Sequence, residues 1–380
     1  MQTELHQRDV RLRQGQLICS PINGRRYRVS ALLGAGGFGV AYRAAQLTGP
    51  RPLRRDYCLK ITENQTAWHR EAYFGDLMEK VPGVIRVYES FVWLRRRSRK
   101  PLYCLKTELA EGGDLASWLD CHREPWKEAR ATREIIRLLR TVKLLHESGA
   151  VHRDITPGNV FVTSKQVLKL GDFGIALHRV GSHDVSADVF AQWFAPSGME
   201  KLGQATWRPA DDVYHIGQLF AILLCGCAES KLTARDVKRL TCSPEAKSII
   251  QRCIGVRRKR FPNAAIMLNA LEKHDSKVIK RVIVRSLKGK KVVFTGPLSI
   301  RRSDAERLVR KVGGIVERRV GHETNVLVLG RQSPNWKADS KGQKLLDIDR
   351  EREFGRNIAR IGEKRFLTLV GVVQHSKEVI

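Results

Sequence analysis

One segment near the middle of the chain constrains its fold more than any other. Asp154 lies in a His-Arg-Asp triplet, Asn159 follows it, and Asp172 opens an Asp-Phe-Gly triplet thirteen residues after that asparagine. The segment matches the patterns HRDxxxxN and DFG together and in order. Carboxylate and amide oxygens are ligands suited to Mg²⁺. We therefore expect the three side chains to serve one site.

A glycine-rich stretch and a lysine at the end of an apolar run precede that segment. The sequence LGAGGFG holds Gly34, Gly36 and Gly39, and glycines let backbone amides approach a phosphate without side-chain collision. Lys60 could hold nucleotide phosphates with its ammonium group. Glu71 opens a helical pattern that can bring a carboxylate back to Lys60. Each feature alone is ordinary, since glycine-rich turns, surface lysines and helical glutamates are common.

These signals in this order resemble the eukaryotic-like protein kinase family. The resemblance implies an α+β bilobal protein kinase fold, with a β-rich N-lobe and an α-rich C-lobe, and it implies ATP and Mg²⁺ as cofactors. It implies that Asp154 orients the acceptor hydroxyl and takes its proton, and that Asn159 and Asp172 are the metal ligands. Lys60 would bind the phosphates of ATP while Glu71 holds it in place.

The resemblance also assigns residues around the nucleotide. Phe38 would cap the tip of the loop that the three glycines fold over the triphosphate. In the stretch that resembles the family's hinge, backbone groups of Glu108 and Ala110 would bond to adenine. Thr107 would lie at the back of the pocket, and Asp114 would reach the ribose.

Three positions depart from the family pattern. Thr156 stands where Ser/Thr-directed members usually carry Lys, which makes Ser/Thr specificity less secure and keeps a small-molecule kinase open as an alternative. Ser197 replaces Glu in an element that resembles Ala-Pro-Glu, so Arg260 lacks its usual partner unless Glu200 substitutes. Ala41 replaces Val over adenine, which should weaken that contact by on the order of 1 kcal/mol.

Other residues are expected to support the site. Asp212 resembles the start of the family's buried helix, where an Asp braces the catalytic loop, and His152 is expected to be a packed structural histidine. Ser182 and Ser186 follow the Asp-Phe-Gly triplet, and a phosphate on that loop could pair with Arg153. The alternative is that both serines are simply solvated.

The C-terminal part resembles a BRCT domain of the type found in NAD-dependent DNA ligases and the large clamp-loader subunit. The sequence VVFTG, the glycine pair at Gly313 and the sequence TNVLVLG from Thr324 carry the resemblance, which covers about residues 288–377. Phe366 lies near the position of the last helix's core aromatic. The first and third of these elements also read as apolar strands of a small α/β domain.

In that family a Thr-Gly pair after the first strand and a basic residue on the second helix bind a phosphate. The resemblance places this role on Thr295 and Gly296 with Lys341 or Lys344, and Arg302 could assist. A hydroxyl, a backbone amide and a cation converging on one dianion form a reasonable phosphate site. The ligand would be a DNA 5′ end or a phosphorylated side chain. The alternative is a protein-docking module in which Thr295 is only a turn residue.

We expect four parts along the chain. A basic lead-in covers residues 1–24, the protein kinase domain 25–272, a charged linker 273–287 and the BRCT domain 288–380. Short apolar stretches from Tyr27 give way near Asp114 to longer segments with helical spacing, which indicates a strand-rich lobe before a helix-rich lobe. The last part alternates strands and helices, as expected of a small α/β domain with a central parallel sheet.

The charge of the chain favours nucleic acid as a partner. Lys and Arg number 69 against 39 Asp and Glu, a formal net charge of +30, and such a field attracts polyanions. The alternative is that the charge only keeps the protein soluble. The eight cysteines lack paired CxxC spacing, which argues against a zinc ribbon. The apolar stretches are too short to cross a bilayer, so we expect a cytoplasmic protein with no membrane partner. The resemblance to ligase-type BRCT domains and the compact size of the kinase part suggest a bacterial or phage source, and DNA binding would associate the protein with the nucleoid.

Together these observations predict an ATP- and Mg²⁺-dependent protein kinase, Ser/Thr-directed, that acts on a protein substrate. Its BRCT domain would bring it to DNA or to a DNA-bound, phosphorylated partner. The opposing hypothesis is a catalytically weak, kinase-shaped scaffold that binds nucleotide and nucleic acid or partner proteins. The physiological substrate, the activating signal and the oligomeric state stay open.

Overall fold

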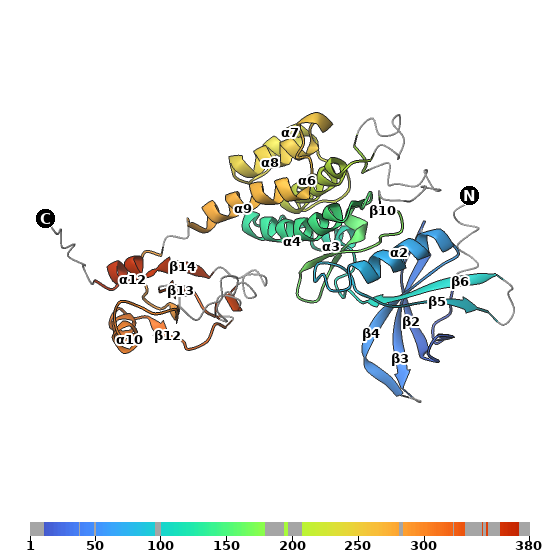
Figure 1. Cartoon of the computed structure of the whole chain (residues 1–380), viewed down its shortest axis with the longest axis horizontal. Coiled ribbons are helices and arrows are strands. Elements are labelled where there is room, and N and C mark those ends of the chain that lie inside the picture. The colour runs from blue at the N-terminus through green and yellow to red at the C-terminus, as the bar shows by residue number, and fades with distance from the viewer. Residues whose placement is uncertain are drawn as a thin grey trace. The chain divides into compact units, whose positions relative to one another are not determined.

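The chain divides into two compact units, Met1–His274 and Asp275–Ile380, in the computed structural model (Figure 1). The division lies inside the predicted linker. The structure describes residues 11–37, 39–48, 51–95, 100–178, 194–196, 207–280, 284–321, 323–330, 344, 347–348 and 358–371, with backbone only at 51–54 and 275–280. Every helix in these ranges is too short or too polar to span a lipid bilayer.

The first unit begins with an antiparallel sheet whose described strands run in the order β1-β2-β3-β4-β6-β5. They are β1 (Leu17–Cys19), β2 (Arg26–Gly36), β3 (Gly39–Thr48), β4 (Arg51–Thr62), β5 (Val87–Leu94) and β6 (Pro101–Glu108). Alternate residues point to one face, so Tyr27 and Val29 of β2 join a core with Leu59 and Ile61 of β4. Strand β1 falls in the predicted lead-in, which therefore supplies the edge of the sheet.

Helix α2 (Gln65–Leu77) packs on this sheet and carries Glu71 (Figure 1). The helix starts where the side chain of Asn64 accepts a hydrogen bond from the Ala67 amide, as an N-cap does. Trp68 Nε1 donates to the carbonyl of Cys104 on β6 at 3.0 Å, and Phe74, six residues later, is buried. These contacts set the rotation of the helix and turn Glu71 toward the strands.

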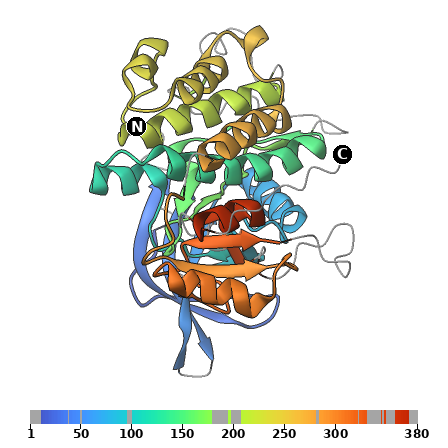
Figure 2. The ribbon, with the colours of Figure 1, turned by 90° about the vertical axis from the view of Figure 1, so that its left-hand side faces the viewer.

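The rest of the first unit is mainly helical, so the predicted bilobal kinase fold is confirmed for this unit (Figure 2). Its helices are α3 (Leu115–His122), α4 (Glu128–Glu147), α6 (Pro209–Cys225), α7 (Ala234–Arg239), α8 (Pro244–Ile254) and α9 (Ala264–Lys280). Short segments lie between α4 and α6: β7 (Ala150–Val151), η1 (Pro157–Asn159), β8 (Val160–Val162), β9 (Leu168–Leu170) and β10 (Leu177–His178). Helix α6 is apolar on nearly all sides and lies in the largest core, against α4 and α8.

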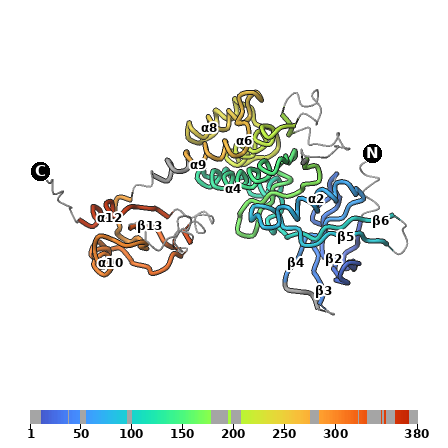
Figure 3. The backbone as a smooth tube through the Cα atoms, viewed as in Figure 1, coloured from blue at the N-terminus to red at the C-terminus, as the bar shows by residue number. Residues whose placement is uncertain are grey.

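The second unit holds a parallel sheet with the described order β12-β11-β13-β14. Its elements are β11 (Lys291–Thr295), α10 (Arg302–Lys311), β12 (Ile315–Val316), β13 (Val326–Leu329), β14 (Ala359–Gly362) and α12 (Glu363–Leu369). Figure 3 traces its backbone, with β13 labelled between α10 and α12. Phe294 packs against Phe366 of α12 on one face, whereas Val293 and Leu327 pack against Ile348 on the other. Burial of both faces explains the continuous apolar runs of these strands.

Candidate active site

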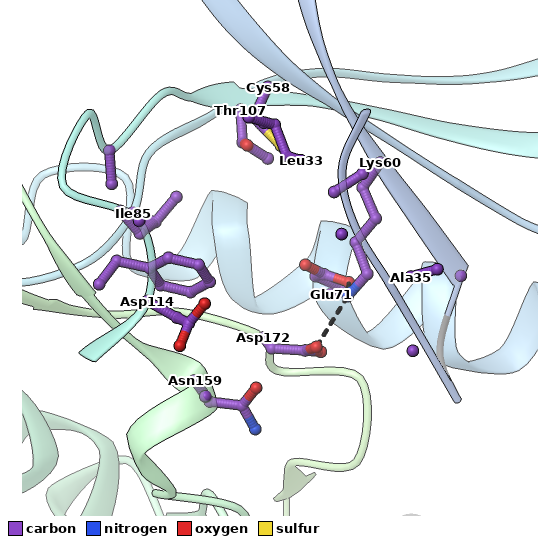
Figure 4. A pocket seen from close by; sticks show the side chains of 18 of the residues that line it. Leu33, Ala35, Cys58, Lys60, Glu71, Ile85, Thr107, Asp114, Asn159 and Asp172 are labelled. Carbon is purple, nitrogen blue, oxygen red and sulfur yellow. Dashed lines mark hydrogen bonds and ion pairs between the residues drawn. The ribbon is translucent and has the colours of Figure 1, made fainter. Parts of the chain in front are cut away.

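A cavity of about 430 Å³ opens in the first unit beneath the glycine-rich turn (Figure 4). The predicted residues that line it are Gly34, Gly36, Gly39, Lys60, Glu71, Thr107, Glu108, Ala110, Asp114, Asp154, Asn159 and Asp172. The structure thus brings together residues from both lobes that are far apart in sequence. Phe38, which was also predicted to lie here, falls outside the described residues.

Lys60 joins the two lobes through a pair of carboxylates. Its Nζ lies 2.7 Å from Oε2 of Glu71 on α2 and 2.9 Å from Oδ2 of Asp172. Figure 4 marks the ion pair between Lys60 and Asp172 with a dashed line. Burial alone would lower the pKa of Lys60, but attraction to Asp172 and Glu71 outweighs it and raises the pKa. Burial raises the pKa of Glu71 to about 7, with Lys60 opposing the shift and Asp172 adding to it. The ammonium therefore stays charged, as phosphate binding requires.

Asp154 and Asn159 form a second pair at the floor of the cavity. Asn159 Nδ2 donates to Oδ2 of Asp154 at 2.7 Å and to the Asp154 carbonyl at 3.0 Å. Oδ1 of Asp154 is buried and accepts no hydrogen bond from the described residues. Burial and the charge of Asp172 raise the pKa of Asp154 to about 7, against the bond from Asn159. A carboxylate with one free acceptor oxygen and a pKa near neutrality suits a general base.

Asp172 is turned into the cavity by an unusual backbone. Its φ of 56° is left-handed, and the Gly174 amide donates to its Oδ1 at 3.3 Å. Next to it, the Phe173 ring lies 5.7 Å from the ring of Phe74 on α2 and 4.7 Å from that of His152. His152 is fully buried, and burial lowers its pKa. It packs behind the site, as predicted, while the packing of Phe173 points its neighbour Asp172 toward Lys60.

The donor set fits a magnesium ion that is bound partly by its substrate. Asn159 and Asp172 present amide and carboxylate oxygens to the same cavity. Among the described residues, no cluster of three or more His, Cys, Asp or Glu side chains forms a ready-made metal cage. Mg²⁺ typically takes one or two carboxylates together with phosphate and water oxygens, so it needs no such cage.

The glycines of the turn differ in what they do. A Cβ added to Gly34 or Gly36 would meet no atom within 4 Å, so these positions leave open space above the cavity. Gly39 has a φ of 131°, and a Cβ there would lie 2.4 Å from the carbonyl oxygen of Ile61. The fold itself therefore requires glycine at position 39, whereas Gly34 and Gly36 keep room for a ligand.

The hinge stretch contains partners that sequence reasoning missed. Lys169 on β9 contacts both carboxylate oxygens of Glu108, at 2.8 and 2.7 Å. Asp114 caps α3 by accepting from the amide and the hydroxyl of Ser117, both at 2.8 Å. Both carboxylates thus have structural roles. A Ser three residues after the Asp was an available capping signal, whereas no local pattern links Lys169 to Glu108.

The lining residues that were not predicted include Cys58, Ile85 and Phe161. Cys58 lies two residues before Lys60 on β4, so strand alternation was a signal that could have placed it on the same face. Ala41 and Thr156, the two departures near the nucleotide, also line the cavity.

Asp212 at the start of α6 braces the loop that begins at His152 and carries Asp154, as predicted for the catalytic loop. Its carboxylate accepts from the amides of His152 and Arg153 at 2.8 and 3.0 Å and from Trp207 Nε1 at 3.0 Å. Nε2 of His146 lies 3.0 Å from the same carboxylate. Burial opposes ionisation of Asp212, but these bonds, with His146 first, hold its pKa at about 2. Arg153 has a left-handed φ of 72°, a strained conformation that the brace holds in place.

Arg260 has a partner that the sequence did not suggest. Its Nη1 lies 3.0 Å from Oδ1 of Asp211, and Arg257 Nη2 contacts the other oxygen. Asp211 is fully buried on α6. The expectation that Arg260 lacks a partner unless Glu200 substitutes is therefore corrected, because α6 supplies the carboxylate. Ser197 and Glu200, like Ser182 and Ser186, lie outside the described residues.

The second unit brings most of its predicted phosphate ligands together at the carboxyl end of β11. Thr295 ends the strand, and Gly296 follows with a φ of 76°. Arg302 Nη2 donates to the Gly296 carbonyl and Lys344 Nζ to the Phe294 carbonyl, each at 3.0 Å. Burial lowers the pKa of Lys344, and the nearby charge of Arg302 lowers it further. Lys341 lies outside the described residues.

Comparison with known proteins places the first unit. Residues 27–270 match the family described as protein kinase domain. The probable serine/threonine-protein kinase zyg-1 of Caenorhabditis elegans is 28% identical over 250 residues, which cover 62% of this chain and 32% of that protein. The delta subunit of calcium/calmodulin-dependent protein kinase type II of Oryctolagus cuniculus is 25% identical over 353 residues, which cover 81% of this chain and 62% of that protein.

Human serine/threonine-protein kinase Nek11 is 26% identical over 215 residues, 53% of this chain and 31% of that protein. The chain thus spans less than two thirds of the length of each of these relatives. The family match nevertheless takes in more than half of the chain and contains every residue of the cavity described above. The chain therefore belongs to the protein kinase family.

Proposed function

We propose that this chain is an ATP- and Mg²⁺-dependent protein kinase that phosphorylates Ser or Thr of a protein substrate. The observation that carries the proposal is the joint geometry of Lys60 and Asp154. Lys60 is tied to both Glu71 and Asp172, and Asp154 keeps a buried oxygen in the same cavity that accepts no hydrogen bond from any described residue. A scaffold that only binds nucleotide would have no need of the second feature.

Each side chain has one task in this proposal. Lys60 binds the ATP phosphates and Glu71 holds it in place, while Asp154 orients the acceptor hydroxyl and takes its proton through Oδ1. Asn159 and Asp172 would hold Mg²⁺, which supplies charge neutralisation at the phosphates. Catalysis then rests on positioning and electrostatics, since phosphoryl transfer needs little covalent help from the protein.

The relatives support Ser and Thr as acceptors, because the proteins named zyg-1 and Nek11 are both described as serine/threonine-protein kinases. Thr156 keeps a small-molecule acceptor as the second candidate. The cavity has Thr156 beside Asp154, and Lys60 is the cation among its lining residues in the described part of the chain. Recovery of the transferred phosphate on protein or on a metabolite decides between the two candidates.

The direct test uses the full chain, radiolabelled ATP and a generic protein substrate. We expect label to appear on Ser and Thr of the protein, and to disappear when EDTA removes Mg²⁺. Phosphoamino-acid analysis of the labelled protein is the measurement. Binding of ATP without any transfer would instead favour the scaffold hypothesis.

We further propose that the second unit is a BRCT-type module that binds a DNA 5′-phosphate. The parallel sheet order, the convergence of Gly296, Arg302 and Lys344 at the end of β11, and the excess of basic residues support it. Ligands of open α/β sheets bind at the carboxyl ends of the strands. Such a module would place the kinase at the nucleoid of a bacterial cytoplasm and raise its effective concentration near DNA-bound substrates.

The double variant Thr295→Val, Lys344→Met is expected to bind 5′-phosphorylated duplex ends about tenfold to a hundredfold more weakly than the wild type. The physical reason is loss of a hydroxyl donor and a charge-assisted bond to one dianion. Fluorescence anisotropy over a range of salt concentrations measures both the affinity and its salt slope, which should fall by about 1.

Arg307→Gln is the matched control. Arg307 lies on α10 with its side chain 77% exposed, and this substitution also removes one positive charge. It should change the affinity little. A Thr295→Val, Lys344→Met double variant that binds phosphorylated and unphosphorylated ends as the wild type does would favour protein docking.

A further inference from the structure

The segment that contains Phe194 and Ala195 is held by a lysine from the loop after α6. Lys231 Nζ donates to the Ala195 carbonyl at 3.0 Å. Phe194 and Ala195 are buried, and Lys231 is half-buried, so this charge-assisted bond is partly shielded from water. Neither Lys231 nor Ala195 lines the nucleotide cavity.

The lysine is itself fixed in position by Gln218 of α6. Gln218 Oε1 accepts from the Leu232 amide at 2.9 Å, and its Nε2 donates to the Leu232 carbonyl at 3.0 Å. The same Nε2 lies 3.2 Å from the hydroxyl of Tyr214, one turn earlier on α6. The buried amide of Gln218 thus pairs with both backbone groups of Leu232. Because Leu232 directly follows Lys231, this pairing leaves the Lys231 backbone little freedom.

The held segment also contacts the catalytic loop through α6. The ring of Phe194 lies 5.3 Å from that of His215, and Nδ1 of His215 accepts from the Ile155 amide at 3.2 Å. Ile155 directly follows Asp154, the proposed base. A displacement of the Phe194 segment would therefore shift residues next to Asp154, whose carboxylate must contact the acceptor hydroxyl. It would not shift the residues that bind the nucleotide.

The ion pair of Arg260 is made with α6. Arg260 bonds to Asp211, which belongs to α6 itself, and Arg257 contacts the same carboxylate. Both oxygens of Asp211 thus serve to pack α6 against the stretch that carries the two arginines. Lys231 supplies a polar bond that ties the Phe194 segment to the helical lobe.

We propose that Lys231 is a positioning residue for the protein acceptor: it anchors the Phe194–Ala195 segment, so that the acceptor docks against a fixed surface beside Asp154. The proposal rests on the proposed kinase function. Lys231 touches neither nucleotide nor reacting atoms, so its removal should change how well the acceptor binds and leave nucleotide binding unchanged. The side chain supplies a donor, which Arg can also supply.

The kinetic test compares Lys231→Met, Lys231→Arg and wild type in the full chain. We expect Lys231→Met to raise the KM for the protein acceptor about tenfold, the effect of losing one charge-assisted hydrogen bond, with the KM for ATP within about twofold of wild type. Lys231→Arg should restore most of the acceptor affinity. An equal rise in both KM values, or no rise, would overturn the acceptor role.

Lys247→Met is the matched control, because Lys247 makes the same kind of bond, from Nζ to the Lys238 carbonyl at 2.8 Å, on an exposed part of α8. It should leave both KM values unchanged. The melting temperature of each variant separates a local effect from general loss of folding.

Hydrogen–deuterium exchange tests the anchor without relying on catalysis. The peptide that contains Phe194 and Ala195 should exchange faster in Lys231→Met than in wild type, Lys231→Arg or Lys247→Met. Unchanged exchange would refute the anchor even in an active enzyme. A wild type that transfers no phosphate would remove the proposed function, and the acceptor role with it, while the exchange result still decides whether Lys231 holds the segment.

Discussion

Replacing Asp172 by Ala is expected to lower Mg²⁺-dependent phosphate transfer by about a thousandfold or more. The change removes one of the two proposed metal ligands and the carboxylate 2.9 Å from Lys60. It leaves Glu71 alone to hold the ammonium. Steady-state transfer of labelled phosphate to protein, measured over a range of Mg²⁺ concentrations, checks the prediction.

A milder variant separates charge from structure. Asp172→Asn keeps the size of the side chain and suits the left-handed φ of 56°, which Asn adopts more readily than Ala. Because the charge of Asp172 contributes to the raised pKa of Asp154, this variant should also lower the pKa of Asp154 from about 7. Asp76→Ala, an exposed aspartate on α2, is the control. Retention of a tenth or more of wild-type transfer by Asp172→Ala would refute the site assignment.

The sequence predicted those parts of the site in which chemistry dictates both residue type and spacing. Asp154 and Asn159 share one turn of chain, so their pairing follows from local geometry. Lys60 and Glu71 belong to a strand and the helix that follows it, and their contact at 2.7 Å needs only that the helix fold back on the sheet. Such short-range relations survive in a linear pattern.

Contacts between distant segments could not be predicted in the same way. Lys169 meets Glu108 across 61 residues, and Asp211 meets Arg260 across 49. Either pair depends on how α6, β9 and the hinge stack in three dimensions, for which a single sequence offers no periodic signal. The strand β1 was missed for a different reason, because three residues are too few to show alternation.

In the second unit, too, local patterns were predictable from the sequence and contacts between distant segments were not. Its parallel strands are short apolar runs buried on both faces, and the runs were visible in the sequence. Lys344 reaches the end of β11 only because the chain returns to the sheet 50 residues after Phe294. A single sequence does not show which lysine this return brings there. The sequence therefore left Lys341 and Lys344 as equal alternatives.

Replacing Asp212 by Ala is expected to have the largest effect on stability, about 3–5 kcal/mol in the free energy of unfolding. The fully buried carboxylate accepts from the amides of His152 and Arg153 and from Trp207, and the variant leaves these donors unsatisfied. Arg153 would lose the bond that helps to hold its left-handed backbone, so transfer activity should fall as well. Urea unfolding followed by tryptophan fluorescence measures the stability, and Asp236→Ala, an exposed capping aspartate on α7, should cost far less.

The pH dependence gives this prediction a second, independent test. The folded pKa of Asp212 is about 2 and the ordinary value is 3.8, so the folded state binds the proton less tightly than the unfolded state. The stabilisation from ionised Asp212, about 2 kcal/mol, is therefore complete above about pH 4 and is lost as the pH falls toward 2. Asp212→Asn lacks this contribution, so its deficit in the free energy of unfolding relative to wild type should narrow between about pH 4 and about pH 2. A deficit that stays constant over that range would mean that packing at α6, and not the charge of the carboxylate, is what Asp212 contributes to the catalytic loop.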